Sequence, residues 1–186
     1  MKKTHRKKAN ILIIYTLLIA MLLNGCSIKR KNIWDEMQFS IRGVSVDFTT
    51  TFTLQEFIDK TGYKNIYPLP HKLKSGEEYK FICSSTSKGG ICGNIKNTYS
   101  YSKDCLDLPI SEFSVEPGTD GFKLNNGIEL WKTTGEEVFK VMGNPSSMEK
   151  ENYSDNYKFL DEATGCYIEI WVNIDNKVCY IKLNYN

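Results

Sequence analysis

Residues 127–145 read GIELWKTTGEEVFKVMGNP, and this stretch decides the fold that the sequence predicts. Thr134 and Glu137 form a T-x-x-E pair, in which the threonine side chain satisfies an early helical N–H and the glutamate reaches back. Gly143 follows nine residues after Thr134, where a left-handed residue ends a helix of about two turns. Apolar residues at i, i+3 and i+4 spacing lie between them: Val138, Val141 and Met142. The stretch therefore predicts a short amphipathic helix with defined ends.

A similar pattern occurs 81 residues earlier, in TTTFTLQEFIDKTGY at residues 49–63. Thr53 and Glu56 repeat the T-x-x-E pair, and Gly62 repeats the glycine nine residues later. Leu54, Phe57 and Ile58 supply the corresponding apolar face. A shared start, length and end indicate an internal duplication, with chance similarity of two short helices as the alternative.

Strand-like segments surround each predicted helix. Each helix is preceded by a segment that begins with phenylalanine, FSIRGVSVDF at 39–48 or FKLNNGIELW at 122–131. Segments of high β propensity follow the helices at 78–85, 89–99, 104–116, 156–160, 166–174 and 177–185.

The last two segments predict a hairpin with its turn at Asp175-Asn176. A two-residue turn pairs residues of one buried face: Val172 with Cys179, Ile170 with Ile181, and Ile168 with Leu183. The other face then pairs Glu169 with Lys182 as an ion pair, and Trp171 with Tyr180 as an aromatic pair. One register thus accounts for both faces.

The first eight residues, MKKTHRKK, are basic and precede the apolar run ANILIIYTLLIAMLL, which together are typical of an export signal. The run ends at Leu23, and Asn24, Gly25 and Cys26 follow, so residues 23–26 read LNGC. These four residues resemble the lipobox of bacterial lipoproteins, in which the cysteine becomes residue one and carries a thioether-linked diacylglyceryl group. The resemblance implies a signal peptide at 1–25, a lipidated tether at 26–32, and a protein anchored to the cell membrane through Cys26 on its extracytoplasmic face. A plain secretory signal is the alternative.

The signal segment holds five of the 24 Lys/Arg residues and none of the 22 Asp/Glu residues, so the remaining chain has a net charge of −3. Without a basic patch, nucleic acid is not an expected partner.

Five cysteines remain after Cys26, and outside the cytoplasm they can pair. A turn at Ser87-Lys88 would place Cys83 opposite Cys92, which is the predicted disulfide; a turn at Thr98-Tyr99 would instead place Cys92 opposite Cys105. Cys166 and Cys179 are predicted to be core thiols. With no CxxC and one histidine after the signal, His71, no metal site is expected.

The stretch 127–145 resembles a signature shared by small outer-membrane assembly lipoproteins and β-lactamase-inhibitor-protein-like domains. The residues that match are Thr134, Glu137, Val138, Gly143 and Pro145. The resemblance implies an α+β fold in which short helices pack on one face of an antiparallel sheet, with tandem copies extending the sheet. It also implies a protein binder. Two such units are expected, at 33–118 and 119–186.

Motifs of catalysis are weak in this chain. Two S-x-x-K matches, at Ser85/Lys88 and Ser100/Lys103, fall in predicted turns and lack the motifs that accompany a serine acylase. No P-loop, G-x-S-x-G or H-E-x-x-H occurs. The sequence favours a protein that is not an enzyme and binds no cofactor, and an uncharacterised envelope hydrolase is a remaining alternative.

The sheet face away from the helices is the candidate binding site. It is predicted to carry Tyr167, Trp171 and Tyr180, joined by Tyr157 or Phe159 from the preceding strand. Aromatic residues on an uncovered face are typical of a contact with another protein or a glycan. We expect a non-catalytic binding or scaffolding module for an envelope protein, or alternatively a binder of cell-wall glycan or a small ligand between the repeats. Packing of these rings within the protein is the competing interpretation.

Overall fold

A computed structural model of the chain describes residues 38–46, 52–63, 65–67, 69–84, 90–117, 119 and 121–185. All of them belong to one compact unit of the chain. The predicted signal peptide, the tether and the lipidation site Cys26 lie outside the described residues. Within the described part, no helix is long and apolar enough to cross a membrane.

Helices α3 (Leu54–Thr61) and α4 (Gly135–Met142) begin at the two predicted capping boxes. The Thr53 N–H donates to Glu56 Oε2 over 2.8 Å, and the Thr134 N–H donates to Glu137 Oε2 over 2.7 Å. Gly62 ends α3 in the left-handed conformation that was predicted. Gly143 ends α4 differently, with φ 80° and ψ −156°, so the chain leaves α4 in an extended direction.

The largest element is an antiparallel sheet of eight strands in the order β10-β11-β12-β13-β8-β6-β5-β3. Its strands are β3 (Asn65–Tyr67), β5 (Glu78–Ser84), β6 (Gly90–Lys96), β8 (Ile110–Val115), β10 (Ser147–Lys150), β11 (Ser154–Leu160), β12 (Tyr167–Asn173) and β13 (Val178–Asn184). The described part is thus mainly antiparallel β structure with two short α-helices, which is compatible with the predicted α+β class.

Two smaller sheets complete the fold. Strands β1 (Phe39–Ile41), β2 (Val44–Val46) and β9 (Phe122–Leu124) form one with β1 in the middle. Strands β4 (Lys72–Leu73) and β7 (Lys103–Asp104) form the other, and β7 leads into the 3-10 helix η1 (Cys105–Asp107). Because β9 pairs with β1, residues on both sides of the predicted boundary at 118/119 share a sheet.

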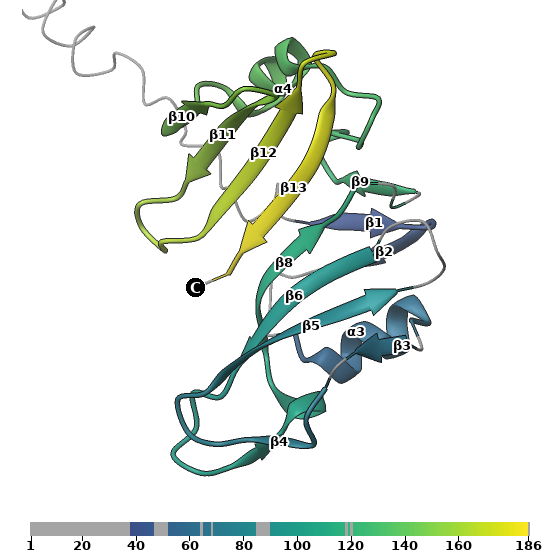
Figure 1. The fold of residues 1–186 in the computed structure, drawn as a ribbon, viewed down its shortest axis with the longest axis vertical. Coiled ribbons are helices and arrows are strands. Elements are labelled where there is room, and N and C mark those ends of the chain that lie inside the picture. Colours follow the sequence, from purple (N-terminus) through teal and green to yellow (C-terminus); the bar gives the residue numbers. More distant parts are fainter. Residues whose placement is uncertain are drawn as a thin grey trace, which may run out of the picture. The chain divides into compact units, whose positions relative to one another are not determined.

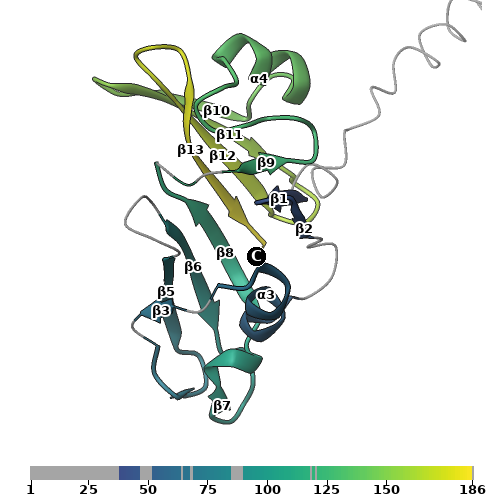
Figure 2. The same ribbon diagram turned by 90° about the vertical axis from the view of Figure 1, so that its right-hand side faces the viewer.

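Both helices and the β1-β2-β9 sheet cover the same face of the large sheet (Figures 1 and 2). Phe113 on β8 contacts Phe39 of β1 and Phe57 of α3, with ring centroids 5.1 Å and 5.0 Å apart. Tyr157 on β11 contacts Phe139 of α4, with ring centroids 4.8 Å apart. The hydrophobic core therefore lies between this face and the helices.

The large sheet joins strands from both halves of the chain. Residues 65–115 contribute β3, β5, β6 and β8, and residues 147–184 contribute β10 to β13. The last strands of the two groups, β8 and β13, pair with each other in the middle of the sheet. Figure 1 shows the two strands next to each other, with β8 in teal and β13 in yellow.

The predicted β12–β13 register is confirmed over four pairs, from Ile168 with Leu183 to Trp171 with Tyr180. It fails nearest the turn, where a bulge pairs Val172 with Val178 instead of Cys179. The Asn173 N–H donates to the Lys177 carbonyl oxygen over 2.9 Å, so the turn holds residues 174–176 instead of two residues, and its last residue, Asn176, is left-handed with φ 58°. Val178 therefore takes the core position, and Cys179 is only partly buried.

The predicted Cys83–Cys92 disulfide is wrong, because the β5–β6 register differs by one residue. Cys83 pairs with Ile91, and Cys92 pairs with Ile82. Since successive side chains of a strand point to opposite faces, Cys83 and Cys92 lie on different faces of the sheet. The alternative Cys92–Cys105 pairing also fails, since Cys105 lies in η1; all five cysteines after Cys26 are free thiols.

Candidate functional site

The face of the large sheet opposite the helices, called the outer face below, is covered by no described helix or strand (Figure 2). It is built from rows of residues that are paired across neighbouring strands. One row is Lys158, Glu169, Lys182, Ser114, Cys92 and Ile82. The next row on one side is Leu160, Tyr167, Asn184, Glu112, Asn94 and Lys80, and on the other side Asn156, Trp171 and Tyr180.

Three of the five aromatic residues predicted for the binding face lie on the outer face. Trp171 and Tyr180 contact each other with ring centroids 5.3 Å apart and planes tilted by 59°. Tyr167 lies in the row next to that of Lys158 and Lys182, and Lys158 Nζ is 3.9 Å from its ring centroid. All three are partly buried by their neighbours on the sheet, and burial raises the pKa of Tyr180.

Tyr157 and Phe159, the other two predicted residues, lie on the opposite, core face. Tyr157 pairs with Ile170 and Phe159 with Ile168, and they are only 6% and 4% exposed. The reason is the period of the strand: in β11 the residues that alternate with these two, Asn156 and Lys158, point to the outer face. The sequence alone did not establish the β11–β12 register, so the correct alternate set was missed.

The charged groups of the outer face bind one another. Lys182 Nζ lies 2.7 Å from Glu112 Oε2, and the Asn94 side chain donates to Glu112 Oε1 over 3.3 Å. Burial alone would lower the pKa of Lys182, but the bonds to Glu112 outweigh it and raise that pKa. The predicted Glu169–Lys182 pair is in register, yet Glu169 accepts instead from Asn156 Nδ2 over 2.7 Å. Glu112 takes the lysine because β8 pairs with β13, a long-range contact that the sequence did not reveal.

Two polar atoms of the outer face are buried without a hydrogen-bond partner among the described residues. They are Asn156 Oδ1 and Trp171 Nε1. Asn156 is 8% exposed and stands directly opposite Trp171 in the register of β11 and β12.

Cys92 lies on the outer face but is 1% exposed. Its thiol donates to Glu116 Oε1 over 3.0 Å, and burial together with this carboxylate raises its pKa to about 12. A thiol with such a pKa stays protonated at neutral pH and is a poor nucleophile. The Cys92 thiol is therefore held in its protonated form, in a hydrogen bond to Glu116.

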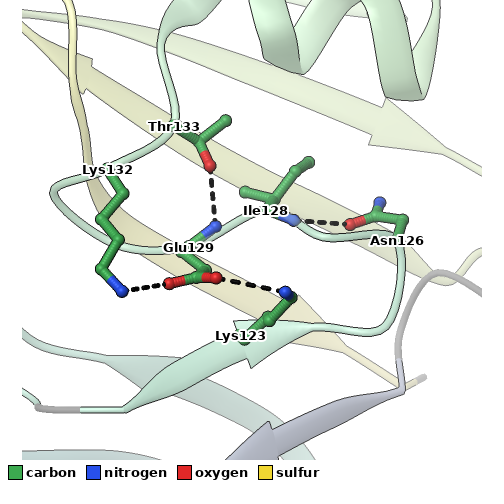
Figure 3. Close-up of polar contacts among 6 residues, drawn as sticks. All are labelled: Lys123, Asn126, Ile128, Glu129, Lys132 and Thr133. Carbon is green, nitrogen blue, oxygen red and sulfur yellow. Dashed lines mark hydrogen bonds and ion pairs between the residues drawn. The ribbon is translucent and has the colours of Figure 1, made fainter.

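A pocket of about 360 Å³ lies beside α4, against the loop that connects β9 to that helix. Figure 3 shows the polar contacts of this loop. Glu129 binds Lys132 Nζ over 2.6 Å and Lys123 Nζ over 3.2 Å, and these bonds lower its pKa. Its N–H donates to Thr133 Oγ1 over 2.8 Å. Both carboxylate oxygens of Glu129 are thus engaged within the protein, and these contacts hold the loop that precedes the helix.

A second, smaller pocket of about 200 Å³ is lined by residues of β1, β2 and β9, strands that come from the two predicted units. Pockets for small ligands usually enclose about 300–1,000 Å³.

Among the described residues, no group of three or more His, Cys, Asp or Glu side chains is placed to hold a metal ion.

Comparisons of the chain with protein-family models, with curated proteins and with solved structures find no match.

Proposed function

We propose that the protein is a lipid-anchored, extracytoplasmic binding or scaffolding module that recognises an envelope protein through its outer face. The observation that carries this proposal is a sheet face free of described covering elements that presents Tyr167, Trp171 and Tyr180. Tryptophan and tyrosine dominate the binding energy of protein interfaces, since they bury large areas at a small entropic cost. The role that we propose is recognition without catalysis.

The electrostatics of the outer face support a protein contact. Lys182 and Glu112, and likewise Glu169 and Asn156, bind each other before any partner arrives. Charges that are already paired lose less free energy when a partner excludes water than isolated charges do. Burial of this face against another protein is therefore feasible.

We also propose that the fold arose from two tandem α+β units. Helices α3 and α4 have the same length and the same capping box, 81 residues apart. The strand order is mirrored about the β8–β13 junction, with β6, β5 and β3 on one side and β12, β11 and β10 on the other. In this arrangement the outer face spans both units, which enlarges the surface available to a partner.

Two residues test the binding surface directly. Intact cells that express the lipidated protein or its Trp171→Ala/Tyr180→Ala variant are treated with a crosslinker, and co-purifying proteins are quantified by mass spectrometry. We expect a partner that the wild type captures and the double variant loses. Equal capture by both proteins would contradict the proposal.

A matched control is Tyr99→Ala/Tyr101→Ala. These two tyrosines lie between β6 and β7, with ring centroids 5.7 Å apart, and are 38% and 59% exposed. The control removes the same kind of exposed ring pair at a different place, so it is expected to retain the partner. Circular dichroism and thermal unfolding establish that each variant is folded.

The anchor is tested separately at Cys26. Cells fed an alkyne analogue of palmitate are expected to label the wild type and to retain it in the membrane fraction. The Cys26→Ala variant is expected to lose the label, because lipidation needs the thiol. Equal labelling of wild type and variant would contradict the lipoprotein proposal.

A further inference from the structure

A second exposed aromatic surface lies beside the small β4–β7 sheet, on the side of the described unit away from α4 (Figures 1 and 2). It is formed by the loop that connects β6 to β7, residues 97–102, which reads NTYSYS. Tyr99 and Tyr101 of this loop are 38% and 59% exposed, and their ring centroids are 5.7 Å apart. Two neighbouring aromatic rings are thus presented to solvent outside the core.

A buried asparagine fixes the shape of this loop. The side-chain Nδ2 of Asn97 donates to the carbonyl oxygens of Leu73 and Tyr101 over 2.9 Å and 2.8 Å, and its Oδ1 accepts from the Tyr99 N–H over 2.9 Å. The backbone N–H and carbonyl oxygen of Asn97 are hydrogen-bonded to the turn that follows β4. Since the loop is already ordered, a partner that binds it loses little free energy in fixing its conformation.

The composition of the loop is typical of surfaces that bind proteins. Antibody binding loops are enriched in tyrosine, serine and asparagine, because tyrosine supplies a large contact area at a low entropic cost and serine supplies adaptable hydrogen bonds. Residues 97–102 consist of two tyrosines, two serines, one threonine and one asparagine. Tyrosine is also enriched among the residues that dominate the binding energy of interfaces. The loop therefore favours contact with another protein.

Three lysines surround the tyrosines without a counter-ion. Lys103 Nζ lies 4.0 Å from the ring centroid of Tyr99. Lys72 and Lys74 are exposed and flank Leu73, the residue of β4 that is bonded to the loop. Within the part of the chain that the structure describes, none of these lysines forms an ion pair.

The nearby acidic groups already have partners. Asp104 Oδ2 lies 2.9 Å from His71 Nδ1, and Asp104 Oδ1 accepts from an N–H of η1 over 3.0 Å. Glu77 accepts from an N–H of the turn that follows β4 over 2.7 Å, and Glu78 stands opposite Lys96 on β5 and β6. The positive charge of the three lysines is thus left for a partner, which favours negative charge on that partner.

We propose that residues 97–102 together with Lys72, Lys74 and Lys103, called the loop surface below, bind an acidic segment of a second protein. The lysines attract the acidic side chains, and the two tyrosines supply the contact area. The loop surface shares no residue with the outer-face site at Tyr167, Trp171 and Tyr180. A protein with both surfaces joins two partners, and the loop surface does not depend on the outer face being a binding site.

Selection from a phage-displayed library of random peptides tests the loop surface, with the full lipidated protein immobilised in detergent. We expect enriched peptides that are rich in Asp and Glu. Tyr99→Ala/Tyr101→Ala and Lys72→Ala/Lys74→Ala should each weaken their binding about tenfold or more. Replacement of Asp and Glu in a selected peptide by Asn and Gln should have the same effect, and added salt should weaken binding further.

Matched controls show whether the loss is specific to this surface. Lys140→Ala/Lys150→Ala removes two exposed lysines from α4 and β10, and Trp171→Ala/Tyr180→Ala removes an aromatic pair from the outer face. Both are expected to bind the selected peptides as the wild type does. Circular dichroism establishes that each variant is folded.

The outcomes distinguish the loop surface from the proposed function. Selected peptides without acidic residues, or peptides that bind Tyr99→Ala/Tyr101→Ala as well as the wild type, would overturn the loop surface and leave the outer face untouched. Soluble wall glycan that binds the wild type but not this variant would overturn the choice of a protein partner. Loss of the crosslinked envelope protein by Trp171→Ala/Tyr180→Ala concerns the outer face alone.

Discussion

Asn176 connects the β12–β13 turn to the start of α4. Its Oδ1 accepts from the Gly135 N–H over 3.0 Å, and its Nδ2 donates to Glu136 Oε2 over 2.7 Å. Its own backbone is left-handed, with φ 58°, a conformation that asparagine and glycine tolerate better than other residues. One exposed side chain thus joins two elements that lie 40 residues apart in the sequence.

Substitution of Asn176 is expected to separate the two contributions. Asn176→Gly loses both hydrogen bonds but keeps the permitted backbone, whereas Asn176→Ala also pays the left-handed penalty of about 1 kcal/mol. In urea unfolding, the wild type should therefore have the highest free energy of unfolding, Asn176→Gly a lower one and Asn176→Ala the lowest. Asp175→Ala, in the same turn, is the control and should be nearly neutral. Equal values for alanine and glycine would refute the backbone argument.

The cysteines differ in exposure, and this predicts their order of alkylation. Cys179 is partly exposed because the bulge displaces it from the core, whereas Cys83 and Cys92 are at most 1% exposed. Burial also raises the pKa of both buried thiols to about 12, which suppresses the reactive thiolate. Iodoacetamide at about pH 8 should label Cys179 first and the other two only after unfolding, as read by peptide mass spectrometry. A linked Cys83–Cys92 peptide would contradict the β5–β6 register.

At the scale of elements, β6 depends on a glycine in its middle. The ring of Phe81 on β5 lies over Gly93, and a Cβ built there would be 2.5 Å from Phe81 Cζ and 2.7 Å from the Glu112 carbonyl oxygen. Both neighbours are held by the core and by β8. The close approach of strand and ring therefore requires glycine.

Gly93→Ala is expected to lower the free energy of unfolding by about 3 kcal/mol, the upper end of the usual cost of overpacking, because neither contact can move freely. Gly90→Ala, in the same strand, is the comparison. Its added Cβ would meet the Cys83 carbonyl oxygen at 3.2 Å, so a small shift suffices and a smaller loss is expected. Thermal and urea unfolding of both variants measure the difference; equal losses would show that the Phe81 contact is unimportant.

Local signals predicted the helices and the last hairpin, because their information lies within a few residues. Thr53 and Thr134 mark the starts of α3 and α4 through their capping boxes. The alternation of apolar and polar residues predicts the four confirmed β12–β13 pairs. The β5–β6 register was missed since it depends on the five residues between Ser84 and Gly90. The short strands β3, β4, β7 and β10 carry too few residues for a recognisable period.

Only those residues of the candidate site that depend on local pairing were predicted from the sequence. Trp171 and Tyr180 follow from the hairpin register, which is local. The role of Asn156 requires the β11–β12 pairing, and that of Glu112 requires the β8–β13 pairing, which joins residues about 70 positions apart. Long-range strand order is not encoded in any single segment.

At the scale of the whole molecule, the β8–β13 junction makes the two groups of strands one sheet. Four residue pairs cross it, from Ile181 with Val115 to Asn184 with Glu112, and the Lys182–Glu112 ion pair adds a side-chain link. Unfolding of either group would expose the strand edge of the other. The two groups are therefore expected to unfold together.

Cooperative unfolding is testable with a substitution in one group and a probe in the other. Trp131 and Trp171, two of the three tryptophans, lie after residue 119, whereas Gly93 lies in β6. Gly93→Ala should shift the tryptophan fluorescence transition and the far-ultraviolet circular dichroism transition by the same amount. A fluorescence midpoint that stays at the wild-type value while circular dichroism shifts would indicate two independent units.

The buried thiols give the whole molecule a dependence on alkaline pH. Burial raises the pKa of Cys83 and Cys92 from 9.0 to about 12, so the folded chain keeps two protons that the unfolded chain releases above pH 9. Their stabilising contribution is complete below about pH 9 and is lost as the pH rises toward 12. The free energy of unfolding should therefore fall by a few kcal/mol between about pH 8 and pH 10.5.

The Cys83→Ala/Cys92→Ala variant isolates this effect. It lacks both thiols but keeps Tyr180 and Tyr185, whose pKa values are also raised by burial, so its stability should still decline at alkaline pH. The decline should be shallower than that of the wild type. Urea unfolding at a series of pH values compares the two slopes, and any constant loss from the substitutions cancels in that comparison. Identical slopes would mean that the thiols do not hold their protons more tightly in the folded protein than in the unfolded chain.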